Sequence, residues 1–204
     1  MRSLAGVILL AVSGFCCADV PADFAQAISD AALARTQISV VYDGSYQRIG
    51  YPGGDVASNK GVCTDVVIRV YRALGFDLQQ AVHEDMRLNF DAYPSRRLWG
   101  MTAPDTNIDH RRVPNLQHFF ARQGESLTVT ENAADYLPGD LVTWMLPGNL
   151  PHIGIVVART SEATGQPLIV HNIGRGPKLE DALFTFPITG HYRFIPGSYA
   201  SATQ

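Results

Sequence analysis

A change of hydrophobic period along the chain most constrains what it can fold into. In residues 62–75 the apolar side chains of Val66, Val70 and Leu74 recur at helical spacing, and Gly75 is placed to end the helix. In the last third, four β-rich segments are separated by turns: DLVTWML, HIGIVVAR, PLIVHNIG and GHYRFIP. Helices followed by strands predict an α+β domain with an antiparallel sheet.

The N-terminus, MRSLAGVILLAVSGFCCADV, has the form of a secretory signal peptide. Arg2 gives a positive start, the apolar run LAGVILLAV is too short to span a bilayer, and small residues precede a cleavage point after Ala18. The alternative is an uncleaved anchor helix. We expect residues 1–18 to be removed and residues 19–204 to form a single domain, periplasmic or secreted, without stable membrane insertion.

The composition is that of an ordinary globular protein. The 204 residues are 46% hydrophobic and 17% charged, and a chain of this length folds without disulfide bonds. The net charge is -3 and no Lys/Arg run occurs, so we expect no nucleic-acid partner. Neither HExxH nor CxxC spacing occurs, so we expect no metal and no cofactor. The sequence leaves the oligomeric state open.

After cleavage the only cysteine is Cys63, at the start of the predicted helix. Cysteines in an oxidising compartment normally pair, so a lone one is either buried and inert or a reactive thiol. The N–H groups and dipole at a helix start favour a thiolate, and the same N–H groups stabilise an oxyanion. We therefore interpret Cys63 as a nucleophile, with simple packing at the helix start as the alternative.

Two histidines are placed to serve such a nucleophile. His152 opens the segment HIGIVVAR and His171 ends the apolar run PLIV, on successive strands that we expect to be neighbours. One would be the general base and the other would orient it. Asn172 is the competing orienting residue. Because side chains alternate along a strand, His171 and Asn172 cannot both face the site.

The segments GVCTDVVIRVYRALG, YLPGDLVTW, HIGIVVA and LIVHNIG, in this order, resemble the NlpC-type papain-like cysteine peptidases of bacterial cell walls. The resemblance covers about residues 46–195, and the whole chain resembles the exported YijF-like branch, a domain of unknown function. It implies a papain-like NlpC-type fold, with a catalytic helix packed on an antiparallel sheet. It also implies Cys63 as nucleophile, His152 as general base and His171 as the residue that orients it.

The resemblance extends to residues around the thiol. Tyr51 is similar to a family tyrosine that lies over the site. Thr64 and Asp65 stand where the family usually has Ser and Gly, and they are candidates for substrate or oxyanion contacts, as is Asn172. An acid at position 65 would raise the thiol pKa, although it would also complement the helix dipole. Asp140, in the PGD turn, is interpreted as structural.

An insertion at about residues 76–126 is longer than the family's usual link. Within it Arg111 and Arg112 are candidates for binding the carboxylates of a stem peptide. The favoured alternative is a solvated loop with local ion pairs.

The predicted function is hydrolysis of an amide bond by an exported cysteine enzyme, with peptidoglycan or a peptide-like molecule as substrate. The order of Cys before His favours a peptidase, because lipid-directed relatives are commonly circularly permuted. One alternative is an amidase, transpeptidase or acyltransferase on another amide or ester. Another is a non-catalytic wall-binding module of the same fold.

Overall fold

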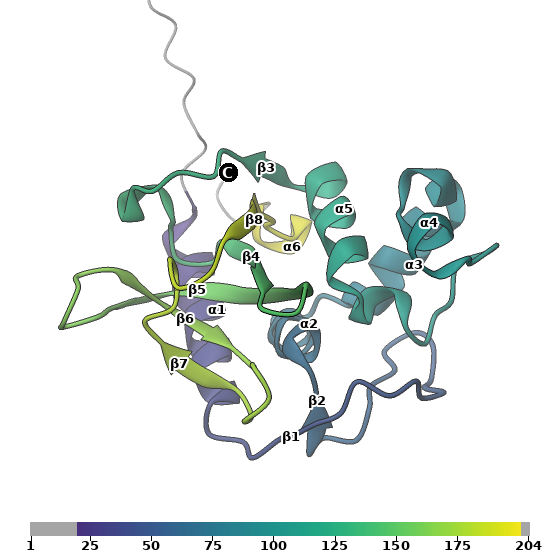
Figure 1. The fold of residues 1–204 in the computed structure, drawn as a ribbon, viewed down its shortest axis with the longest axis horizontal. Coiled ribbons are helices and arrows are strands. Elements are labelled where there is room, and N and C mark those ends of the chain that lie inside the picture. Colours follow the sequence, from purple (N-terminus) through teal and green to yellow (C-terminus); the bar gives the residue numbers. More distant parts are fainter. Residues whose placement is uncertain (1–19, 201–204) are drawn as a thin grey trace, which may run out of the picture.

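The structure, a computed structural model, describes residues 20–200, and the predicted signal peptide lies outside these residues. Helices dominate its first two thirds (Figure 1). The α-helices are α1 (Ala22–Arg35), α2 (Cys63–Ala73), α3 (Leu78–Asn89), α4 (Ser95–Trp99), α5 (Val113–Gln123) and the short α6 (Gly197–Ala200). Single 3₁₀ turns are η1 (Phe90–Ala92), η2 (Asp109–Arg111) and η3 (Ala133–Asp135).

Six strands form one antiparallel sheet in the order β3-β8-β4-β5-β6-β7. They are β3 (Glu125–Leu127), β4 (Leu141–Leu146), β5 (Leu150–Thr160), β6 (Pro167–His171), β7 (Lys178–Glu180) and β8 (Ile188–Arg193). Two further strands, β1 (Val41–Tyr42) and β2 (Lys60–Gly61), pair in parallel just before α2. The predicted α+β class with an antiparallel sheet is confirmed, as is a helix that starts at Cys63.

The core lies between the sheet and the helices α1 and α2 (Figure 1). Alternate side chains of β5 point to opposite faces, so Ile153 and Ile155 pack against the helices, whereas Val156 belongs to a smaller cluster around Trp144. Tyr71 is fully buried in α2 and donates a hydrogen bond of 2.8 Å to the carbonyl of Phe194. This packing fixes α2, and with it the position of Cys63, against the middle of the sheet.

The segment between α3 and α5 contains more regular structure than its prolines and charges suggest. The prolines and charges of residues 93–114 are typical of a loop, but the structure has α4, η2 and the start of α5 there. Helix α4 ends at Gly100, which adopts a left-handed conformation with φ of 64°. The Ser95 hydroxyl bonds the side chain of Asn115 in the interior, which holds this segment onto α5.

Among the helices of residues 20–200, none combines the length and apolar character that crossing a bilayer requires.

Candidate active site

Cys63 is the first residue of α2 and exposes 4% of its surface. The preceding backbone is fixed by Asp65, whose Oδ2 accepts the N–H of Val62 at 2.6 Å. Gly61 has φ of 153°, and a Cβ at that position would lie 2.9 Å from the Cβ of Asp65. Glycine at position 61 therefore allows the chain to pass directly from β2 into α2, with the Asp65 side chain packed close to the backbone.

Burial raises the pKa of the Cys63 thiol to about 11. Hydrogen bonding from the backbone N–H groups of Ile153 and Thr64 favours the thiolate and partly offsets the rise, whereas the Asp65 charge adds to it. The helix start that should activate the thiol is present, but desolvation outweighs it. Burial thus opposes the activation expected from the position of Cys63 at a helix start.

His152 and His171 lie together on adjacent strands. Nε2 of His152 is 2.9 Å from Nδ1 of His171, and each residue exposes 2% of its surface. Burial, followed by the neighbouring His171, lowers the pKa of His152 to about 3. The directions of these two pKa shifts favour an uncharged thiol and an uncharged His152 imidazole.

The thiol meets β5 beside His152. The β5–β6 ladder ends at the pair Gly154 and His171, and the N–H of β5 that acts on the sulfur belongs to Ile153, the residue between His152 and Gly154. Within residues 20–200, no hydrogen bond joins the sulfur to the His152 ring, and none uses Nδ1 of His152. The thiol thus lies against the peptide group between His152 and Ile153, and the His152 ring contacts His171 rather than the sulfur.

Gly154 makes the close approach of the two histidine-bearing strands possible. A Cβ there would lie 2.7 Å from Cγ2 of Ile169 and 3.0 Å from Cβ of His171. Contacts that short require the neighbours to move, so only glycine leaves β6 in its present place.

A fourth residue, Glu180 of β7, extends the histidine pair and was not foreseen from the sequence. Its Oε2 is 2.8 Å from Nε2 of His171. Burial lowers the pKa of His171, and Glu180 opposes that shift. The segment KLE is too short to show a strand period, so no pattern in the sequence indicated that it pairs with β6.

Asp65 and Arg111 bind each other in the interior. Nε and Nη2 of Arg111 lie 2.8 and 2.9 Å from the two carboxylate oxygens of Asp65. Thr64 takes part as well, because its hydroxyl donates to the carbonyl of Arg111 at 3.1 Å. The expectation of a solvated loop at Arg111 is wrong. The polar groups named here hydrogen-bond one another, so they are not available for the substrate contacts suggested for Thr64, Asp65 and Arg111.

Arg112 also lies away from the thiol. It pairs with Asp109 at 3.3 Å, and its guanidinium sits 4.0 Å from the centre of the Trp99 ring. Its contacts stay within the insertion, which agrees with the alternative of local ion pairs in this segment.

Tyr51 does not contact the thiol. Its ring packs edge-on against His83 of α3, with 5.0 Å between ring centres. Tyr42 of β1 interacts electrostatically with Cys63: its pKa is raised to about 12 by burial and then by the charges of Cys63 and Asp65. Tyr42 is paired with Gly61, two residues before the thiol, a register that the sequence does not reveal.

Asn172 does not contact His152. Its side-chain amide reaches the carbonyl of Gly61 at 3.5 Å, and its oxygen accepts the N–H of Gly174. It connects the end of β6 to the strand before Cys63, while His171 makes the contact with His152.

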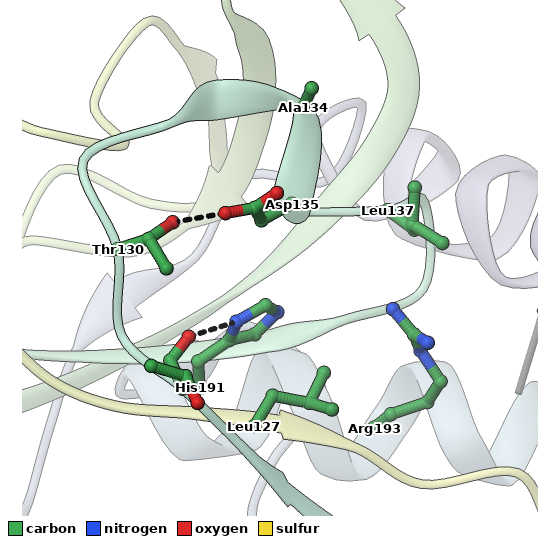
Figure 2. A pocket seen from close by; sticks show the side chains of 8 residues that line it. Leu127, Thr130, Ala134, Asp135, Leu137, His191 and Arg193 are labelled. Carbon is green, nitrogen blue, oxygen red and sulfur yellow. Dashed lines mark hydrogen bonds between the residues drawn. The ribbon is translucent and has the colours of Figure 1, made fainter. Parts of the chain in front are cut away.

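A pocket of about 340 Å³ lies elsewhere, near β3 and β8 (Figure 2). His191 and Arg193 point from β8 toward the segment that carries Asp135 and Leu137. Both basic groups bind the buried Asp140, His191 at 2.7 Å and Arg193 at 2.8 Å. Their polar groups are engaged with Asp140, which fits the structural role expected for that residue.

Among residues 20–200, no group of three or more His, Cys, Asp or Glu is arranged to hold a metal ion.

The chain is similar to known proteins in two respects. It is 47% identical over 169 residues to the "Uncharacterized protein YijF" of Escherichia coli (strain K12), an alignment that covers 83% of this chain and 81% of that protein. It also resembles a crystal structure described as similar to lipoprotein, NLP/P60 family, from Staphylococcus aureus subsp. aureus Mu50. That likeness has 14% identity and a TM-score of 0.45, and covers 90% of this chain but 45% of the other.

Residues 29–194 match the model of a family described as "Domain of unknown function (DUF1287)". This match spans most of the chain and agrees with the high identity to YijF. The chain therefore belongs to the DUF1287 family.

Proposed function

We propose that this protein is an exported cysteine hydrolase of the papain-like NlpC type, and that it cleaves an amide bond in peptidoglycan stem peptides. One observation carries the proposal. The thiol at the first residue of α2 lies against the peptide group that follows His152, and the His152 ring is bonded to His171. A nucleophile, a base and a residue that orients the base are the groups such a reaction requires.

The resting groups are uncharged, so the reaction starts from a thiol and a neutral imidazole. With a thiol pKa of about 11 and an imidazole pKa of about 3, a free ion pair does not accumulate. We infer that Nδ1 of His152 removes the proton as the sulfur attacks the carbonyl carbon. Hydrogen bonds between nucleophile and base are often long in a free enzyme and tighten when substrate binds.

The later steps use the same groups. The backbone N–H groups at the start of α2 hold the oxyanion of the tetrahedral intermediate. His152 then gives its proton to the leaving amine, which leaves an acyl group on Cys63 as a thioester. Water, deprotonated by His152, hydrolyses the thioester and restores the thiol. Because Cys63 is only 4% exposed, a local movement around it must admit the peptide before attack.

The proposed substrate and location are supported by the sequence. The motifs around Cys63, Asp140 and His152 resemble those of wall peptidases, and the N-terminal segment has the form of a signal peptide. Peptidoglycan, a glycan polymer cross-linked by short peptides, is the peptide-containing substrate that we propose for an exported hydrolase of this type. Amidase, transpeptidase and acyltransferase reactions would use the same thiol on another amide or ester.

A second candidate function is supported by the thiol itself. A buried cysteine with a pKa of about 11 is also what a non-catalytic module would contain, because nothing there would require a thiolate. In that case the fold would bind wall peptides without turning them over.

Product analysis separates these functions. Purified peptidoglycan is digested with the protein, and the soluble fragments are weighed by mass spectrometry. Hydrolysis of a stem peptide releases fragments with a new amine and a new carboxylate. Transpeptidation instead joins the acyl group to another amine, forming a new cross-link, and releases the original amine without adding water. Binding to the insoluble wall without any new fragment would support the non-catalytic module.

A further inference from the structure

Glu180 completes a line of hydrogen bonds that crosses three adjacent strands. Oε2 of Glu180 is 2.8 Å from Nε2 of His171, whose Nδ1 is 2.9 Å from Nε2 of His152. In the ladder Glu180 stands opposite Ile169, which lies two residues before His171 on the same face of β6. Diagonal neighbours of this kind are within reach of a long side chain. The line therefore runs from the edge of the sheet to the candidate base.

Glu180 determines which ring nitrogen of each histidine on this line carries the proton. An ionised carboxylate only accepts hydrogen bonds, so the proton of neutral His171 must be on Nε2. Nδ1 of His171 is then an acceptor, and Nε2 of His152 must carry the proton it donates. A neutral imidazole has one N–H, so Nδ1 of His152 is left with a free electron pair.

Without Glu180 the same two histidines have a second arrangement. His171 could carry its proton on Nδ1 and donate to Nε2 of His152, whose own proton would then be on Nδ1. That arrangement keeps the 2.9 Å contact but leaves no acceptor at Nδ1 for the thiol proton.

We propose that Glu180 is a positioning residue that sets the tautomers of His171 and His152, and so makes Nδ1 of His152 the base. The effect on catalysis rests on the proposed function, whereas the hydrogen bonds that set the tautomers do not. The side chain of Glu180 is 46% exposed, so its charge is screened by water and contributes little direct stabilisation. Its effect comes from the direction of its hydrogen bond.

The test measures tautomers and turnover separately in the full mature chain. Protein with ¹⁵N-labelled histidine is examined by NMR at neutral pH, where the two ring nitrogens report which one carries the proton. The variants are Glu180→Ala and Glu180→Gln, with Glu125→Gln of the exposed edge strand β3 as a matched control. Variants His152→Gln and His171→Gln assign the signals, and thermal melts confirm folding.

In the wild type and in Glu125→Gln, both His152 and His171 are expected to carry the proton on Nε2. In Glu180→Ala the second arrangement should become populated, and kcat should fall by roughly tenfold with KM little changed. Glu180→Gln should show a mixture too, since an amide both donates and accepts. Unchanged tautomers in Glu180→Ala, or a wild type with the proton on Nδ1 of His152, would overturn the inference.

The two ideas fail in different ways. A tautomer change in Glu180→Ala supports the role of Glu180 even if the wild type hydrolyses nothing. Absence of hydrolysis by the wild type would refute the proposed function instead. A wild type that hydrolyses peptidoglycan, together with unchanged tautomers in Glu180→Ala, would refute the role of Glu180 alone.

Discussion

Arg111 reaches from the insertion to the first turn of α2 and binds Asp65 with two hydrogen bonds, of 2.8 and 2.9 Å. Both side chains are nearly inaccessible, with 2% and 3% exposed. The guanidinium also donates to the carbonyls of Asp43 and Ser45 at 3.3 Å. One arginine thus joins the helix that carries Cys63 to the insertion and to the loop after β1.

This pair accounts for the two residues that follow the thiol. Where the wall peptidases that the sequence resembles usually have Ser and Gly, this chain has Thr64 and Asp65, and both bind Arg111. The acid also accepts the N–H of Val62. Its negative charge is therefore compensated within the fold, and its effect on the thiol pKa is secondary to that of burial.

We predict that breaking this pair strongly destabilises the protein. Arg111→Ala or Asp65→Ala leaves an unpaired buried charge, which costs about 3–5 kcal/mol in free energy of unfolding. Urea denaturation measures this value. The control is Arg96→Ala, which breaks an exposed pair with Asp91 and should cost under about 1 kcal/mol. An Arg111→Ala loss no larger than the control loss would contradict the buried-pair account.

Alkylation of Cys63 by iodoacetamide should depend steeply on pH. The thiol reacts as a thiolate, and a raised pKa keeps it protonated until higher pH, so the rate should rise about tenfold per pH unit from pH 7 to about 10. Mass spectrometry of the chain without residues 1–18 follows the reaction, with the urea-unfolded protein as reference. A rate at pH 6 above that of the unfolded protein would instead indicate a preformed thiolate–imidazolium pair.

Adding one methyl group at Gly154 should disturb the histidine pair. Gly154→Ala places a Cβ against Ile169 and His171, so we expect a loss of about 1–3 kcal/mol in unfolding free energy and a fall in turnover. Gly50→Ala is the control, because its nearest neighbour would be the Cα of Gly54 at 3.9 Å. Wild-type stability and turnover in Gly154→Ala would show that the close strand approach is not needed.

The two histidines should differ in their contributions to turnover. His152→Ala removes the proton acceptor and should lower kcat by roughly 10²–10⁴-fold. His171→Ala removes only its orientation and should leave residual activity above that of His152→Ala. His118→Ala on α5, near Tyr93, serves as the control. Rates are measured as fragment release from peptidoglycan, and a larger loss in His171→Ala would reverse the assigned roles.

Local sequence patterns were sufficient for the elements that carry the site. The spacing of Val66, Val70 and Leu74 predicted a helix from Cys63, and the apolar runs after His152 and before His171 predicted two strands that are indeed neighbours. These features depend on residues within one helix or strand, where side-chain period and hydrophobicity determine the structure.

Contacts between distant segments could not be predicted in the same way. Arg111 and Asp65 are 46 positions apart, and the sequence does not show which charges in a polar insertion become buried. The register of β1 and β2 pairs Tyr42 with Gly61, two residues before the thiol, whereas Tyr51 packs against His83. The raised thiol pKa likewise depends on burial under the whole fold, which the position of Cys63 at a helix start does not indicate.

The most direct test of the central claim is the rate at which purified peptidoglycan releases peptide fragments with wild-type protein and with Cys63→Ala. Removing the sulfur leaves the core contacts of α2 in place, so thermal unfolding should show a folded variant. We predict fragment release by the wild type and none by Cys63→Ala. Wild-type rates of release by Cys63→Ala would contradict the account.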